Sequence, residues 1–319
     1  MRIKKLFLNC ALLCSSTLFV FLLLEFFLRI LPISNRVYYL RLVWNHWEDP
    51  KMPKWYNELY EYDETLGYER KEIHREMKRI IQDSSSSYKI LVLGDSVTQW
   101  GKYVDYFKDL LINRYKNKDI EVVNAGVMGY DTELEYRYLK HRGLKLNPDL
   151  VLVQFCPNDF GGTPVIIKKS DGSWLALDGR RRLSKLINPH LLVRSRLYEF
   201  VALRLLSISK KKKGVLRDNV KEPLRRIKQL LEKEGIPFYF IVFPLLEESG
   251  YGRITYQTVM GIVKELDLST HTIDLFPYYS HFDFEMIKDD PFHPNQKGQR
   301  IVAIVLMEKL KAFLDKQFN

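Results

Sequence analysis

Two hydrophobicity patterns divide the chain. From Leu6 to Leu24 the residues are nearly all apolar and none is charged, whereas from Lys89 onward short apolar runs alternate with amphipathic stretches. A helix over Leu6 to Leu24 would be about 28 Å long, and the hydrocarbon core of a bilayer is about 30 Å thick. The first pattern therefore predicts one membrane-spanning helix, and the second predicts a folded domain that follows it.

The residues around the apolar run indicate its orientation. Arg2, Lys4 and Lys5 precede it, so the positive-inside rule places the N-terminus in the cytoplasm and the rest of the chain outside. A cleaved signal peptide is the alternative, but the run exceeds a typical signal core and no small-x-small site follows in LEFFLRILPISNR. A lipoprotein site at Cys14 would need a small residue in place of the preceding leucine, and a buried core helix is disfavoured by the run's length. We expect an uncleaved signal-anchor in the cell membrane and a periplasmic or extracellular domain.

The alternating pattern predicts an α/β fold. Continuous runs of Val, Ile, Leu and Phe are typical of parallel strands buried on both faces, and the amphipathic stretches between them are typical of covering helices. We expect a three-layer α/β/α sandwich with a mainly parallel sheet. The expected strands are 89–94, 120–126, 149–155 and 236–244, and the expected helices are 104–115, 132–142 and 222–235.

Domain boundaries follow from the same changes in pattern. We expect a cytoplasmic stub and anchor over 1–31, a juxtamembrane segment and linker over 32–88 that packs onto the main domain, and the main domain over 89–319. Residues 161–221 form a long insertion, where function often resides. It contains LLVRSRLYEFVALRLLSIS followed by KKKK. Two interpretations stay open: a lid or acceptor-binding wall, and a helix that packs on the sheet with a solvated lysine run behind it.

Composition narrows the class of protein. The chain has 319 residues, and its 46% of hydrophobic residues are enough for a core without disulfides. Of the three cysteines, only Cys156 lies in the main domain. The net charge of +11 is spread over the chain and forms no nucleic-acid-binding motif. We expect no nucleic-acid partner, and an anionic membrane or an acidic glycan suits this charge better.

The stretch KILVLGDSVTQWG places a serine just past the first expected strand. In open parallel sheets, ligands bind beyond the carboxyl ends of the strands, so Ser96 lies where a nucleophile is expected. A second interpretation is structural: SVTQ also matches a capping box, with Ser96 as N-cap and Gln99 reaching back.

A serine nucleophile needs a base and an acid that orients the base. KDDPFHPNQ near the C-terminus offers Asp290 and His293, in a loop before a helix that Asn295 can cap. Asp289 adjoins Asp290, but only Asp290 has the three-residue spacing to the histidine. Taken singly, both residues also fit an ordinary loop aspartate and a surface imidazole.

Hydrolysis of an ester also needs donors for the tetrahedral oxyanion. The second strand ends in NAGVMG, where Gly129 offers a backbone N–H with no side chain in the way, and the third ends in QFCPND, where Asn158 offers a side-chain amide. Each also fits an ordinary turn. All these positions fall at the same edge of one expected sheet.

Together these residues resemble the SGNH hydrolases, also called the GDSL esterase/lipase superfamily. GDSVT, NAGVMG, PND and DPFH occur in the family's order over about the last 230 residues. The resemblance implies a flavodoxin-like sandwich in which Ser96 is the nucleophile, His293 the base and Asp290 its partner. It also implies an oxyanion hole formed by Ser96 N–H, Gly129 N–H and the Asn158 amide. Cys156 stands where the family usually has glycine, so we expect the backbone path into that amide to differ from the family's.

The expected activity needs no cofactor. H-E-x-x-H, paired C-x-x-C and Walker A motifs are absent from the sequence, and His74 and the other histidines before position 293 are isolated along it. We expect a membrane-anchored serine esterase that acts on an acyl ester of a cell-envelope lipid or glycan. The alternatives are an O-acyltransferase acting on an envelope polysaccharide, and a silent binding or assembly scaffold.

Overall fold

The computed structural model describes residues 2–33, 58–82, 87–168, 174–180, 183, 186–209 and 214–318. About half of the expected juxtamembrane segment and linker, residues 34–57 and 83–86, and the lysine run at 210–213 lie outside these residues. Contacts divide the chain into two compact units, Met1–Asn57 with Pro164–Lys212, and Glu58–Thr163 with Lys213–Asn319.

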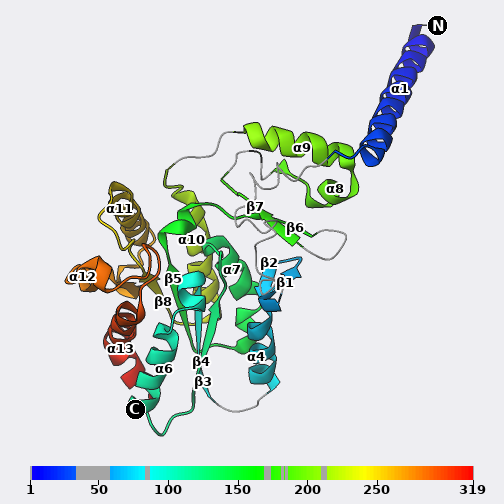
Figure 1. The fold of residues 1–319 in the computed structure, drawn as a ribbon. Coiled ribbons are helices and arrows are strands. Elements are labelled where there is room, and N and C mark those ends of the chain that lie inside the picture. Colours follow the sequence, from blue (N-terminus) through cyan, green and yellow to red (C-terminus); the bar gives the residue numbers. More distant parts are fainter. Residues whose placement is uncertain are drawn as a thin grey trace. The chain divides into compact units, whose positions relative to one another are not determined.

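The second unit is built on a five-stranded parallel sheet (Figure 1). Its order is β4-β3-β5-β8-β9, and every neighbouring pair is parallel. The predicted α/β fold with a mainly parallel sheet is therefore confirmed. The fifth strand was not predicted, because three residues are too few to show a pattern. The strands are β3 (Tyr88–Gly94), β4 (Ile120–Gly126), β5 (Leu150–Phe155), β8 (Phe238–Val242) and β9 (Thr272–Asp274).

Helices cover both faces of this sheet (Figure 1). On one face α6 (Tyr103–Arg114) packs against α13 (Gln296–Phe318), and on the other α7 (Thr132–His141) packs against α10 (Asp218–Glu234). Alternate side chains of β3 point to opposite faces, so Ile90 and Val92 join one core cluster with apolar residues of α6 and α13. The remaining helices on this unit are α4 (Lys71–Gln82), α5 (Ser96–Gln99), α11 (Gly250–Glu265) and α12 (Phe276–Tyr279), with 3₁₀ turns η1 (Gly143–Leu146), η2 (Pro157–Phe160), η4 (Ser269–His271) and η5 (Phe284–Met286).

The segment before the sheet protects its open edge. β1 (Tyr60–Asp63) and β2 (Gly67–Arg70) form an antiparallel hairpin that leads into α4. The Arg70 guanidinium donates to the carbonyl oxygens of Gly126 at 3.0 Å and Asn124 at 3.3 Å on β4. Occupied carbonyl groups make an edge strand a poorer template for pairing with another chain.

The first unit contains the apolar N-terminal helix and most of the insertion. α1 (Arg2–Ile30) is followed, after the large gap in the sequence, by β6 (Val165–Lys168), β7 (Trp174–Leu177), α8 (Pro189–Arg194) and α9 (Arg196–Ile208). β6 and β7 pair as an antiparallel hairpin. The helix expected over the apolar-basic stretch is broken at Ser195, whose hydroxyl accepts from Tyr198 N–H at 3.0 Å and caps α9.

Candidate active site

The site begins where β3 turns into α5. Asp95 is the N-cap of α5 and accepts from Val97 N–H at 2.9 Å, so Ser96 is the first helical residue. The capping-box interpretation of Ser96 is therefore wrong, and its hydroxyl is not used to cap the helix. A Cβ on Gly94 would lie 2.1 Å from the Thr98 hydroxyl, so only glycine permits this close approach of strand and helix.

Ser96, His293 and Asp290 form a continuous chain of hydrogen bonds. Ser96 Oγ lies 2.8 Å from His293 Nε2, and His293 Nδ1 lies 2.7 Å from Asp290 Oδ2. The two ends of this chain are 197 residues apart in sequence. Asn295 N-caps α13 by accepting from the N–H groups of Lys297 and Gly298, as predicted, and so fixes the loop that carries the histidine.

The carboxylate of Asp290 is held in its ionised form. Its Oδ1 accepts backbone N–H groups from Phe292 at 2.8 Å and His293 at 3.0 Å. Partial burial alone would raise the pKa of Asp290, but these bonds and the one from the imidazole outweigh it and lower the pKa. A negative carboxylate is what an adjacent imidazolium requires.

Two further strand ends lie beside the β3 to α5 turn. Asn158, on η2 after β5, donates its Nδ2 to Asp95 Oδ2 at 2.8 Å. After β4, Val127 N–H donates to the Gly94 carbonyl at 3.0 Å. Gly129 follows with φ 80°, a left-handed conformation that favours glycine. The described part of the chain offers no hydrogen-bond acceptor to Gly129 N–H.

Sequence reasoning missed the residues that connect these strand ends. Gln154 on β5 accepts from Asp95 N–H at 3.0 Å and from the Thr98 hydroxyl at 2.9 Å. Gln99 accepts from Met128 N–H at 2.6 Å, which fixes the loop before the glycine. A polar residue inside an otherwise apolar strand was the available signal for Gln154.

A group of buried carboxyl groups lies on the other side of Asp95. Burial raises the pKa of Asp95 despite its hydrogen bonds from Asn158 and Val97, and it raises the pKa of Asp131 to about 6. The pKa values of Glu135 and Asp159 lie well above their usual range for the same reason, reinforced by repulsion between neighbouring carboxylates. Within the described residues, both carboxyl oxygens of Glu135 lack a hydrogen-bond partner.

An exposed aromatic residue stands beside the histidine. The rings of Trp100 and His293 are 6.0 Å apart between centroids, and 49% of Trp100 is exposed. Trp100 also borders a recess of about 410 Å³ whose lining is largely polar and charged, with residues including Arg70, Glu72 and Lys108.

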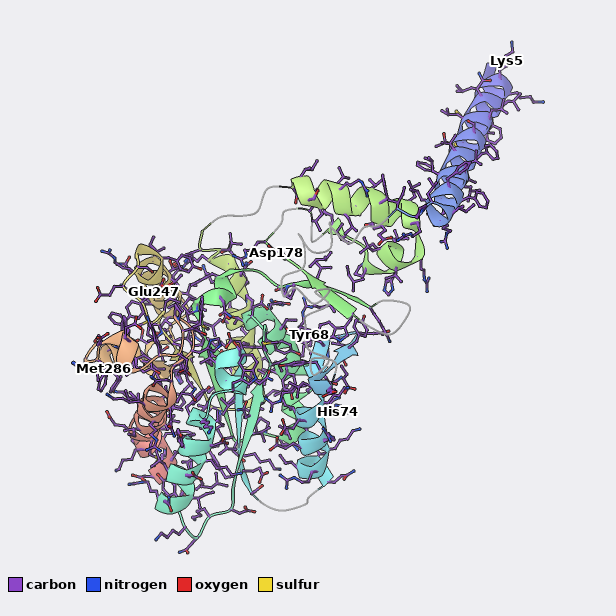
Figure 2. All side chains as sticks on the ribbon, in the orientation of Figure 1. Lys5, Tyr68, His74, Asp178, Glu247 and Met286 are labelled. Carbon is purple, nitrogen blue, oxygen red and sulfur yellow. The ribbon has the colours of Figure 1, made fainter. Side chains whose placement is uncertain are left out.

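Two other sequence interpretations can be compared with the structure. Cys156 is buried, and burial raises the pKa of its thiol well above the usual value, so it is a packing residue and not a second nucleophile. His74 is isolated along the sequence, but it is not isolated in the folded protein. It lies on α4 (Figure 2), and it, Glu61 and Glu69 present ligand atoms within 4.8 Å of one another. Arg142 Nε lies 3.2 Å from Glu69 and already supplies the positive charge that balances it.

Several solved structures match the chain at low similarity. An acetyl xylan esterase is 16% identical, with a TM-score of 0.47 over 69% of this chain and 98% of its own. An acetylxylan esterase from Geobacillus stearothermophilus is 18% identical, with a TM-score of 0.46 over 71% of this chain and 95% of its own. A lipase/acylhydrolase from Enterococcus faecalis is 17% identical, with a TM-score of 0.46 over 70% of this chain and 96% of its own. Values this low say nothing about the substrate of this chain.

Sequence comparison identifies the family. No curated protein matches the chain significantly. The sequence profile of the GDSL-like Lipase/Acylhydrolase family matches residues 92–301, which is about two thirds of the chain and includes the Ser96 turn and the His293 loop. The chain therefore belongs to the GDSL-like lipase/acylhydrolase family and is an ester-hydrolysing enzyme.

Proposed function

We propose that the protein is a membrane-anchored serine esterase in which Ser96, His293 and Asp290 are the catalytic triad. The observation that carries this proposal is the unbroken chain from Ser96 Oγ through both imidazole nitrogens to a carboxylate, with contacts of 2.8 and 2.7 Å. These lengths are within hydrogen-bond reach for proton transfer. Membership of an acylhydrolase family supplies the reaction class.

The proposed reaction has two steps. Ser96 Oγ attacks the ester carbonyl carbon while its proton passes to His293 Nε2, and the resulting tetrahedral intermediate collapses as the imidazolium returns that proton to the leaving alcohol. Water, deprotonated by the same imidazole, then attacks the acyl-serine, and the second tetrahedral intermediate collapses as the imidazolium returns the proton to Ser96 Oγ and the carboxylic acid is released. Asp290 holds the imidazole in one tautomer and stabilises its charged form.

We assign the oxyanion hole to Ser96 N–H, Gly129 N–H and the Asn158 amide. Asp95 fixes the amide by accepting one of its two protons at 2.8 Å, which leaves the second proton for a ligand. The positive φ of Gly129 and the lack of an acceptor for its N–H among the described residues support the second donor. Preorganised donors of this kind stabilise the transition state because they need no rearrangement as charge develops.

We propose that α1 is retained as the membrane anchor. The most apolar 18-residue window of Lys4–Ile30 has a mean hydropathy of 2.2 and none of it is buried, and Figure 2 shows Lys5 near the free end of the helix. The Glu25 carboxylate accepts from Ser195 Oγ at 2.8 Å and from Arg196 N–H at 3.0 Å, so α1 contributes to the folded first unit. A signal peptide removed after export would leave these groups without partners. Mass spectrometry of the mature N-terminus tests this, and loss of residues before about position 30 would exclude the anchor.

Covalent labelling tests the nucleophile. Full-length protein in detergent is treated with a fluorophosphonate probe, digested and mapped by mass spectrometry. We expect one adduct, on Ser96, that is absent from Ser96→Ala and strongly reduced in His293→Ala. An unlabelled wild-type protein with native thermal unfolding would refute the mechanism.

Transfer of the acyl group to a sugar hydroxyl is the second candidate. It uses the same residues, and the recess beside Trp100 favours it because its charged lining and exposed indole suit a carbohydrate. The discriminating measurement is the ratio of acylated glycan to free acid when an acyl ester and an oligosaccharide are supplied together. Free acid alone, at every oligosaccharide concentration, supports the esterase.

A further inference from the structure

Every exposed residue of the helix α9 is apolar. Val201, Leu205 and Ile208 are 43%, 48% and 78% exposed, and the other residues of α9 are buried or half-buried. Their spacing of four and three residues places them in one stripe along the helix. A helix that has only apolar residues on its exposed side is normally covered by something.

The opposite face of α9 already has its own core. Ala202, Leu203 and Leu206 pack with Ile167 and Leu192 in a buried cluster. At about 100° per residue, these positions point away from the exposed stripe. Because the buried residues of α9 face this core, the stripe lies on the outside of the unit.

Another helix of the same protein shows the ordinary arrangement. In α10 the buried residues also form a stripe, but every exposed residue is polar or charged. These exposed residues are Asp218, Arg225, Gln229, Glu232, Lys233 and Glu234. The chain thus follows the usual pattern where a helix faces water, and α9 departs from it.

Hydrogen bonds hold the start of α9 at the end of α1. Glu25 accepts from Ser195 Oγ at 2.8 Å and from the N–H groups of Arg196 at 3.0 Å and Leu197 at 2.9 Å. Arg29 donates to the Arg194 carbonyl at 2.7 Å. Glu25 is the first charged residue after Lys5, about 30 Å along the helix, which matches the thickness of a hydrocarbon core. The start of α9 therefore lies at the level where the apolar part of α1 ends.

We propose that the apolar stripe of α9 docks into the surface of the same bilayer that α1 spans. Figure 1 shows α9 leading away from the end of α1, as an interfacial helix leads away from a spanning one. Leu186, Leu191 and Val193 just before α9 are exposed as well. In sequence, Arg194 precedes the helix and four lysines at 210–213 follow it, which favours anionic lipid headgroups. This proposal rests on the membrane anchor proposed above.

The test measures lipid contact at single positions. The full chain, with Cys10, Cys14 and Cys156 replaced and hydrolytic activity retained, is reconstituted in vesicles of phosphatidylcholine and phosphatidylglycerol. A fluorophore is attached at Leu205→Cys, or at one of two reference positions, Phe19→Cys on α1 and Ile304→Cys on α13. These reference side chains are 62% and 58% exposed. Quenching by spin-labelled lipid is compared with quenching by aqueous iodide.

We expect lipid quenching at Leu205→Cys to exceed that at Ile304→Cys several-fold, and iodide quenching to show the reverse order. Iodide access at Leu205→Cys together with lipid contact at Phe19→Cys would overturn the docking and leave the anchor intact. No lipid contact at Phe19→Cys would refute the anchor, and the docking with it. Self-quenching between labelled copies without lipid contact would assign the stripe to protein association and so overturn the proposal.

A second measurement does not depend on cysteine replacement. Photoactivatable phosphatidylglycerol is crosslinked to the unmodified chain in the same vesicles, and the adducts are mapped by peptide mass. Adducts on the peptide that contains Val201 to Ile208 support the docking. Adducts confined to α1 would overturn it.

Discussion

Two acidic residues, Asp290 and Glu135, differ in their exposure, in their hydrogen bonds and in the direction of their pKa shifts. Asp290 has 49% of its side chain exposed, accepts three hydrogen bonds and has a lowered pKa. Glu135 is 1% exposed, has no hydrogen-bond partner in the described chain and has a strongly raised pKa. A perturbed pKa is often taken as a sign of function. In this protein the acids with the most strongly raised pKa values are buried, and the acid that contacts the histidine is the accessible one.

The largest expected effect separates Asp290 from its neighbour Asp289. Asp290→Asn keeps the shape but no longer stabilises the correct imidazole tautomer or its charge, so kcat for a simple acyl ester should fall about 10⁴-fold. Asp289→Asn is the matched control, because only the backbone N–H of Asp289 faces His293, donating to its carbonyl oxygen at 2.9 Å. Steady-state hydrolysis of p-nitrophenyl acetate measures both variants. Equal losses in the two would show that the assignment to Asp290 is wrong.

A smaller loss of kcat should follow from replacing Asp95, the buried acid that accepts a hydrogen bond from the Asn158 amide. Asp95→Asn replaces one of the two carboxylate oxygens by an NH₂ group, so the side chain can no longer accept from both Val97 N–H and the Asn158 amide. We therefore expect kcat to fall about 10²-fold with little change in KM, as for a displaced oxyanion donor. Asp159→Asn is the comparison, because the Asp159 carboxylate accepts from the Thr132 hydroxyl at 3.0 Å and not from the amide. Circular dichroism and thermal unfolding establish that both variants fold. A larger loss in Asp159→Asn would reverse the roles given to these two acids.

The same distinction explains what could be predicted from the sequence. Strand β3, the turn at Ser96 and the spacing of Asp290 and His293 are local patterns, and the sequence shows them directly. Whether an acid is solvated or buried depends on residues far away in sequence: Asp95 and Asn158 are 63 residues apart, and Ser96 and His293 are 197 apart.

Short elements and environments were the parts that could not be predicted. The hairpin β1–β2 and strand β9 contain too few residues to show a period of two. The break at Ser195 and the exposed stripe of α9 depend on which face of the helix finds a core. An apolar run looks the same in sequence whether protein or lipid covers it.

Stability measurements should give the next smaller effect, at Glu135. Its folded pKa is raised above the unfolded value, so its contribution to stability is complete at low pH and is lost as pH rises toward the folded pKa. Glu135→Gln removes this dependence, so the stability of the variant should gain on that of the wild type as pH rises above the unfolded pKa, by at most about 1.4 kcal/mol per pH unit. Denaturant unfolding of the full chain in detergent measures the gain. Glu133→Gln should instead lose stability, because Glu133 pairs with Arg137 and Arg226. A gain of stability in both variants would indicate that the removal of any negative charge stabilises the protein.

The smallest expected effect has the opposite dependence on pH. The pKa of Asp290 is lowered in the folded protein, so its hydrogen bonds stabilise the fold above the unfolded value and are lost as pH falls through the folded value. Because the carboxylate is half exposed and screened by water, Asp290→Asn should cost about 0.5 kcal/mol at pH 7 and progressively less as pH falls through the folded pKa. Unfolding curves measured over this pH range give the difference. If the contribution of Asp290 to stability rises with pH while that of Glu135 falls, one sheet edge holds one carboxyl group ionised and another protonated. If both contributions change with pH in the same direction, burial alone governs both groups, and the hydrogen bonds to Asp290 contribute little to its charge.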